Sequence, residues 1–212
     1  MNKTEEELIW NTYNNFHEYN NLRKFLLENP VRTDGDYQPI EFEGDNPKGM
    51  YEYIKTPNSK YKKIYDLTIN GSTSVSLYER QEFGNTYDIK VISEENKIVV
   101  GNIIYDKTNN GIEIDSIYNQ GMFRGVIYKV FFEYLLPKYN KITSSAFHSQ
   151  KGEGFWRKVL EYGFLKHESF STYVINLNTS EQFNINNLND IGSYYGDEGE
   201  DFEKYRFVIE KK

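Results

Sequence analysis

The sequence contains no cysteine and only three histidines in 212 residues. The absence of cysteine excludes disulfides, thiolate metal sites and cysteine nucleophiles. The histidines lie far apart in the sequence, so we expect no histidine-based metal site. No apolar run is long enough to span a bilayer, and the N-terminus lacks the apolar core of a signal peptide. We therefore expect a soluble, cytoplasmic protein without a metal or a membrane partner.

Basic side chains are also too few for a nucleic-acid-binding protein. The 32 acidic residues outnumber the 25 basic ones, which gives a formal net charge of −7 at pH 7. Nucleic-acid-binding domains carry a basic surface, so we expect no nucleic-acid partner. The length predicts one domain over residues 1–212. Within it we expect an N-terminal helix and irregular extension over 1–60, a core over 61–177, and an acidic loop with a final strand over 178–212.

Hydrophobic spacing changes along the chain. Residues 5–28 carry apolar side chains at helical spacing, whereas residues 28–49 are rich in Pro, Gly and Asp and predict an irregular connection. Alternating apolar residues then predict five strands, at 62–69, 72–79, 86–93, 97–106 and 111–118. The Asn70-Gly71 pair between the first two predicts a β-hairpin.

The order after residue 118 becomes helix, strand, helix. Apolar residues predict a helix over 126–135 that ends at Pro137, and a second helix over 152–163 that Gly163 terminates. The remaining predicted strands are 141–149, 171–177 and 204–210, and the polar stretch between the last two predicts a loop.

A strand–helix–strand crossover makes the strands at 111–118 and 141–149 parallel. The predicted fold class is therefore α/β, with a mixed, mostly antiparallel central sheet, one parallel strand pair and helices on both faces. Ligands of such sheets bind at the carboxyl ends of parallel strands, here near Tyr118 and His148.

Three stretches carry a resemblance to a known family. They are "GIEIDSIYNQGMFRGVIYKVFFEYLL", "KITSSAFHS" and "GEGFWRKVLEYGF". In this order they resemble the fourth strand, pyrophosphate loop and third helix, then the fifth strand, then the fourth helix of the GCN5-related N-acetyltransferase (GNAT) family. The resemblance covers roughly residues 87 to 177. The sequence is also similar to divergent acetyltransferase-like proteins encoded by phages. It implies an acyl-CoA N-acyltransferase-like fold, with acetyl-CoA as cofactor.

The resemblance implies that the turn after Ile117 cradles the pyrophosphate. Free backbone N–H groups and the helix dipole converge there on an anion, and glycines allow close approach. The family pattern aligns Gln120 with its first position and Gly125 with its last, but a bulky Phe123 replaces the inner glycine. The residues implied to bind the cofactor are Ile117, Tyr118, Gln120, Gly121, Met122, Phe123, Arg124, Gly125 and Ser149. A simple tight turn before a core helix explains the same residues.

Two further positions depart from the family. Its usual acid, a tyrosine in the fourth helix, aligns with Trp156, which cannot donate a proton to a thiolate. Its frequent asparagine before that helix aligns with Ser149. The candidate catalytic residues are instead Glu113, Asp115, Tyr118 and His148. Each also has a purely structural explanation, such as outward-facing charges on a half-exposed strand.

Three functions follow from these residues. The first is a GNAT-like N-acyltransferase that moves an acetyl group from acetyl-CoA to an unknown amine. The second is a catalytically inactive protein on the same fold that binds another protein, in the host cytoplasm or virion if a phage encodes it. The third is a different α/β binding module, because the GNAT resemblance does not cover residues 1–80.

Overall fold

The computed structural model describes residues 47–69, 73–119, 125–145, 150–187, 191, 193–194 and 204–212. All of them belong to one compact unit that spans residues 40–212. The helix predicted over residues 5–28 lies outside the described residues, as does most of the irregular connection predicted after it.

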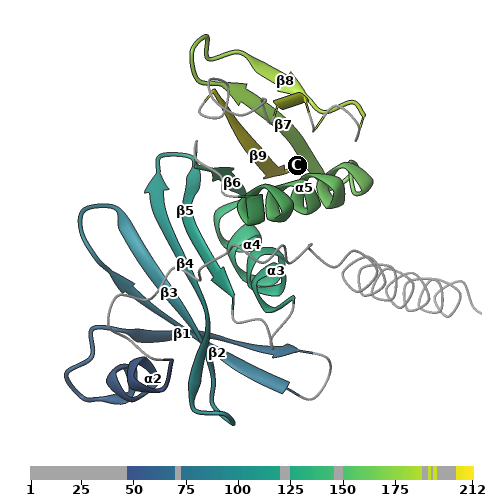
Figure 1. Ribbon diagram of the computed structural model, residues 1–212. Helices are drawn as coiled ribbons and strands as arrows, with labels where there is room; N and C mark the ends of the chain where they lie inside the picture. The colour runs from purple at the N-terminus through teal and green to yellow at the C-terminus, as the bar shows by residue number, and fades with distance from the viewer. Residues whose placement is uncertain are drawn as a thin grey trace, which may run out of the picture. The chain divides into compact units, whose positions relative to one another are not determined.

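Nine strands of the described residues form one sheet. They are β1 (Lys62–Ile69), β2 (Thr73–Gln81), β3 (Thr86–Ser93), β4 (Ile98–Thr108), β5 (Gly111–Asn119), β6 (Lys141–Ser144), β7 (Phe170–Asn176), β8 (Gln182–Asn184) and β9 (Tyr205–Lys211). Their order in the sheet is β1-β2-β3-β4-β5-β6-β9-β7-β8 (Figure 1). The β5–β6 pair is parallel, and the other described pairs are antiparallel.

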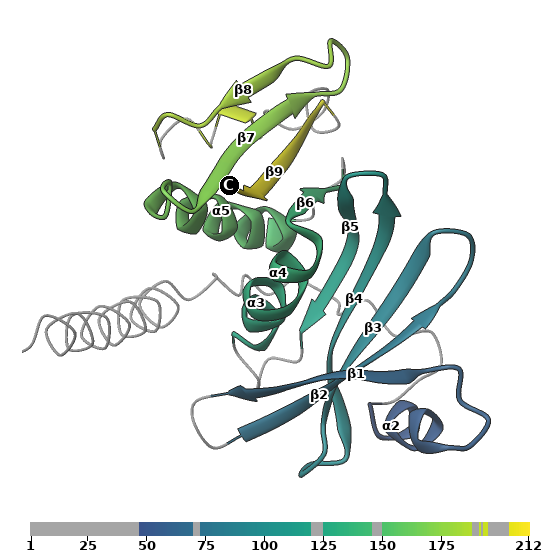
Figure 2. The same cartoon turned by 180° about the vertical axis from the view of Figure 1, so that it is seen from behind.

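The crossover between β5 and β6 is helical, as the sequence predicts. It consists of α3 (Val126–Lys129), a π-helical segment η1 (Val130–Leu135) and α4 (Leu136–Tyr139). The other described helices are α2 (Pro47–Lys55) and α5 (Gln150–Leu165). Figures 1 and 2 both show α5 beside the α3–α4 segment. The predicted mixed α/β fold class with one parallel pair is confirmed.

The main core lies between the sheet and the helices α3 to α5. The register aligns Ile112, Ile142 and Ile209 across β5, β6 and β9, and all three side chains are buried in this core. Gly101 of β4 lets the crossover helix approach, because a Cβ there would lie 2.7 Å from Cδ1 of Ile127. The first half of the crossover is thereby fixed over β4 and β5.

Helix α2 covers the other face of the N-terminal strands. Its buried Ile54 packs with Ile92 and Val99, which alternate with the main-core residues of β3 and β4. The helix was not predicted, because its first three residues fall in the Pro/Gly-rich stretch. Its Lys55 contacts Glu94 at 2.5 Å at the end of β3. Helices therefore lie on both faces of the sheet, as predicted.

A buried ionic cluster lies on the same face as α2. Asp88 is 1% exposed and Lys90 is 4% exposed, and their charged atoms lie 3.1 Å apart. Tyr61 donates a hydrogen bond of 2.5 Å to Oδ2 of Asp88, and Arg80 lies 3.5 Å from the same oxygen. The carboxylate of Asp88 therefore compensates the buried charge of Lys90 and accepts a hydrogen bond from the buried hydroxyl of Tyr61.

Pro137 does not end the crossover helix, which corrects the sequence prediction. The helical segment continues through Pro137 to Tyr139, and Asn140 follows in the left-handed conformation. Proline lacks the N–H of a regular helical turn. The preceding six residues are π-helical, and π-turns inside helices accommodate such local disruption.

Gly163 does not terminate α5, which is a second correction. The helix extends to Leu165, and Gly163 packs against the sheet. A Cβ at this position would lie 2.4 Å from Cγ2 of Thr172 and 3.0 Å from Cδ1 of Ile209. The glycine is therefore required by the close approach of α5 to β7 and β9.

This close approach makes Gly163→Ala destabilising. We expect a loss of about 1–3 kcal/mol from crowding, reduced by up to about 1 kcal/mol through the better helix propensity of alanine. Urea denaturation at constant m-value measures the loss. The double variant Gly163→Ala/Thr172→Ser removes the contacted methyl group and should regain most of the stability. Equal stability of Gly163→Ala and the wild type would contradict the packing role.

The stretch between β7 and β9 is not entirely a loop. It contains the short strand β8, which pairs with β7, and buried side chains at Ile185 and Ile191. The strand was not predicted, because a segment of three residues is too short to show alternation of apolar and polar side chains. The acidic residues 195–203 lie outside the described residues.

Candidate functional site

The parallel strands β5 and β6 pair over a short region that reaches the end of β6. Their pairing covers Ile112 to Ile114 on β5, and the N–H of Ser145 donates to the carbonyl of Ile114 at 2.9 Å. β5 continues to Asn119, and its last residues pair with β4 alone among the described strands. β5 therefore extends five residues beyond Ile114, the last residue that pairs with β6 among the described residues. This is the place where the sequence analysis expects a ligand.

A β-bulge in β5 directly follows Ile114, the last residue that pairs with β6. Tyr105 of β4 pairs with Ile114 and Ile104 pairs with Ser116, so that Asp115 has no partner in the ladder. Bulges bend a strand and redirect its side chains. The bulge interrupts simple alternation between Glu113 and Asp115. The register instead places Glu113 on the face of Ser116, opposite Asp106 and Ile104.

Three predicted site residues lie near the connection from β5 to the crossover helix. They are Ile117, Tyr118 and Gly125. Tyr118 is opposite Asn102, and Ile117 is opposite Ile103 and packs against the main core. Gly125 precedes α3 with a φ of 80°, which a residue with a Cβ adopts only with strain. The structure thus places Ile117 and Tyr118 in the last part of β5 and Gly125 at the start of the crossover helix.

Seven predicted site residues lie outside the described residues, and their roles stay predictions. They are Gln120, Gly121, Met122, Phe123, Arg124, His148 and Ser149. Trp156 is described and is 3% exposed, with its ring edge-on to Phe131 at 5.8 Å. Trp156 therefore packs in the main core.

Glu113 lies in a pocket on the sheet face opposite the main core. Its carboxylate pairs with Arg206 of β9 at 2.9 Å. Burial raises the pKa of Glu113, the charges of Asp106 and Asp115 raise it further, and Arg206 opposes the shift. The negative charge of Asp115 thus contributes to the raised pKa of Glu113, although Asp115 has no partner in the β4–β5 ladder. A carboxylate with a raised pKa is a stronger base than an ordinary surface glutamate.

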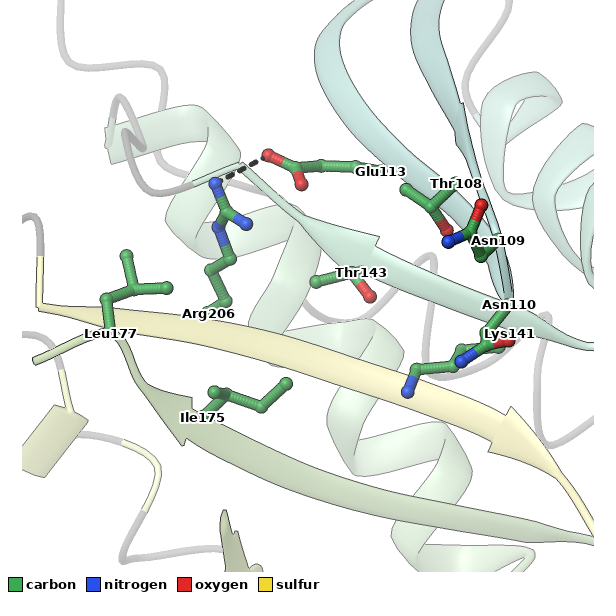
Figure 3. A pocket seen from close by; sticks show the side chains of 9 residues that line it. All are labelled: Thr108, Asn109, Asn110, Glu113, Lys141, Thr143, Ile175, Leu177 and Arg206. Atoms are coloured by element: carbon green, nitrogen blue, oxygen red, sulfur yellow. Dashed lines mark ion pairs between the residues drawn. The ribbon is translucent and has the colours of Figure 1, made fainter. Parts of the chain in front are cut away.

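The pocket itself has a volume of about 340 Å³ and is open to solvent. Figure 3 shows Arg206 and Glu113 on one side, Lys141 with the asparagines of the β4–β5 turn on the other, and Thr143 between them. Its lining residues are Thr108, Asn109, Asn110, Glu113, Lys141, Thr143, Ile175, Leu177 and Arg206.

Sequence reasoning missed Arg206 and Lys141. Alternation in "KYRFVIE" places Arg206 on the face opposite Phe207, which is a detectable signal. It does not show that β9 lies beside β6, because that pairing joins residues more than sixty positions apart.

Among the described residues, no helix is long and apolar enough to cross a membrane. No group of three or more histidine, aspartate or glutamate side chains among them is arranged to hold a metal ion.

Comparisons with known proteins give little further information. No family model matches the chain, and no curated protein matches it. One solved structure that matches comes from Bacteroides thetaiotaomicron, and its name assigns it to the GNAT family of acetyltransferases. The match has 13% sequence identity and a TM-score of 0.33, and it covers 62% of this chain and 65% of that chain, just under two thirds of its length.

Proposed function

We propose that the chain is an N-acyltransferase that moves an acetyl group from acetyl-CoA to an amine. The observation that carries this proposal is the bulge at Asp115, which directly follows the region where β5 pairs in parallel with β6, with Gly125 at the start of the crossover helix. Ligands bind at the carboxyl ends of parallel strands where neighbouring strands part. The end of a strand can also offer backbone groups to the amides of a linear ligand such as the pantetheine arm of CoA.

Acetyl-CoA supplies an activated thioester, from which the acetyl group passes to the amine nitrogen as a C–N bond forms, the C–S bond breaks and the departing thiolate takes up a proton. Backbone N–H groups of β5 near Asp115 would stabilise negative charge on the carbonyl oxygen. Glu113 would accept the proton that the amine loses, directly or through a water molecule, and its raised pKa favours this role. Tyr118, on the same face, would line the approach.

A thermal shift with acetyl-CoA tests the proposal. At a concentration a hundredfold above Kd, a ligand that binds the folded state stabilises it by about 2.7 kcal/mol. For a chain of this size we expect a rise in Tm of roughly 5–10 °C. Glu113→Gln should keep the shift and lower kcat, whereas the exposed control Glu168→Gln should change neither. No shift at millimolar acetyl-CoA would remove the proposal.

A second candidate function is a non-catalytic protein of the same fold that binds another protein. The position of the family's acid is occupied by Trp156, which is buried in the main core and cannot contact a thioester. Under this function acetyl-CoA gives no shift, and a protein partner binds Glu113→Gln as well as the wild type. The same titration therefore separates the two candidates.

A further inference from the structure

The pocket beside Glu113 has two chemically different ends. At one end, the carboxylate of Glu113 is held by Arg206 at 2.9 Å. At the other end, Lys141 of β6 lies near the amide side chains of Asn109 and Asn110 (Figure 3). Thr143, which is register-paired with Glu113, connects the two ends along the floor. A ligand that spans the pocket would therefore contact a carboxylate at one end, and an ammonium group and two amides at the other end.

Lys141 is a cation that carries no ion pair within the described ranges. Its ammonium lies 5.5 Å from the ring centroid of Tyr173, and the hydroxyl of Tyr173 donates to Glu210 at 2.9 Å. The side chain of Tyr173 thus interacts with both Lys141 and Glu210, which are register partners across β6 and β9. An ammonium group beside two amides is a suitable set of donors for an oxyanion.

Arg206 completes the charge distribution. Its Nε is buried and has no hydrogen-bond partner, while one terminal nitrogen contacts Glu113. Arg206 also lines the pocket, where its positive charge attracts an anion. The pocket therefore attracts negative charge at Lys141 and Arg206, and it offers Glu113 to positive charge or to an amine proton.

We propose that this pocket binds the acetyl acceptor, and that the acceptor is a small primary amine that also carries a carboxylate or a phosphate. The oxyanion contacts Lys141 and the side chains of Asn109 and Asn110, and the amine lies beside Glu113, at the end nearer the bulge of β5. This proposal rests on the proposed acetyltransferase function. It narrows the substrate class from any amine to acidic amines, despite the net charge of −7.

An NMR titration of the full chain tests the proposal without acetyl-CoA. The probes are 4-aminobutanoate for the carboxylate and O-phosphoethanolamine for the phosphate, with 4-aminobutanamide and ethanolamine as counterparts that lack the anion. We expect at least one acidic amine to shift the side-chain signals of Asn109 and Asn110 with a Kd on the order of 1 mM or tighter. Its counterpart should bind at least about tenfold more weakly, since hydrogen bonds to charged groups contribute that much.

Matched variants locate the binding. Lys141→Met keeps the length of the side chain and should weaken the acidic amine about tenfold, whereas Lys62→Met on the exposed edge strand should have no effect. Asn109→Asp lies in an exposed turn, where folding is not at risk, and should weaken binding by repulsion. The proposal is overturned if neither acidic amine binds, if the counterparts bind equally well, or if both pocket variants bind like the wild type.

The acetyl-CoA thermal shift on the same samples separates this proposal from the proposed function. A shift without binding of either acidic amine overturns the acceptor assignment and leaves the transferase intact. Binding of an acidic amine without a shift supports the anion site and overturns its assignment to an acetyl acceptor. Both signals together support the proposal, and the stronger of the two acidic probes identifies the anion as carboxylate or phosphate.

Discussion

Asp88→Ala should lower the free energy of unfolding by about 3–5 kcal/mol, the usual cost of removing one partner from a buried ion pair. The side chain is 1% exposed, and its Oδ2 accepts the hydroxyl of Tyr61 at 2.5 Å and contacts Lys90 at 3.1 Å. Without the carboxylate, the ammonium of Lys90 stays in an environment where its own exposure is 4%. The loss measured by urea denaturation would thus come mainly from removing the carboxylate that the buried Lys90 and Tyr61 contact.

A double variant distinguishes this cause from a simple loss of packing. In Asp88→Leu/Lys90→Met no charge of the pair remains, so most of the lost stability should return. As a matched control, Glu133→Ala removes a carboxylate whose ion pair with Lys129 lies at the surface. Such pairs contribute about 0–1 kcal/mol, and the control should lie in that range. If the double variant is less stable than Asp88→Ala, the pair itself stabilises the fold and the desolvation argument is wrong.

Local alternation predicted most strands because it reflects physics within a few residues. The stretches at 62–69, 86–93 and 111–118 match β1, β3 and β5 within one residue at either end. Asn70-Gly71 lies in the connection between β1 and β2, which pair antiparallel as predicted. The parallel pair was predictable for the same reason, since a helical crossover leaves few other arrangements.

The failures share a different cause. Pro137 and Gly163 were interpreted by their local preferences, yet the first is accommodated by π-turns and the second is fixed by contacts with Thr172 and Ile209. The insertion of β9 between β6 and β7 depends on pairing between distant residues. No spacing within a single segment carries this information.

The candidate site was predictable in part for the same reasons. Its location at the end of β5 followed from the crossover, and Glu113 was identified as a candidate base from its place on the strand. The bulge at Asp115 was not predictable, because nothing in "GIEIDSIY" signals an extra residue. The partners Arg206 and Lys141 became visible only when the register joined three strands. Electrostatics of the site, unlike its position, therefore depends on non-local pairing.

Gly111→Ala should be the most damaging single methyl addition among the described glycines. Gly111 begins β5 with a φ of 153°, and a Cβ there would lie 2.3 Å from the carbonyl oxygen of Lys141. Strained backbone costs about 1–3 kcal/mol, and crowding costs about 1–3 kcal/mol more. We expect a total loss of about 4 kcal/mol in urea denaturation, because the contacted atom belongs to the backbone and cannot rotate away.

The same substitution tests how the site is held together. Displacement of Lys141 would disturb the pairing of β5 with β6 and the cationic end of the pocket at once, so binding of acidic amines should fall even where the variant stays folded. Gly84→Ala is the matched control: its φ is 55°, but a Cβ would meet no atom within 4 Å. It should lose only about 1–2 kcal/mol, the cost of the left-handed backbone for alanine. Equal losses in the two variants would show that backbone conformation alone matters, and that close contact between the starts of β5 and β6 does not position the pocket.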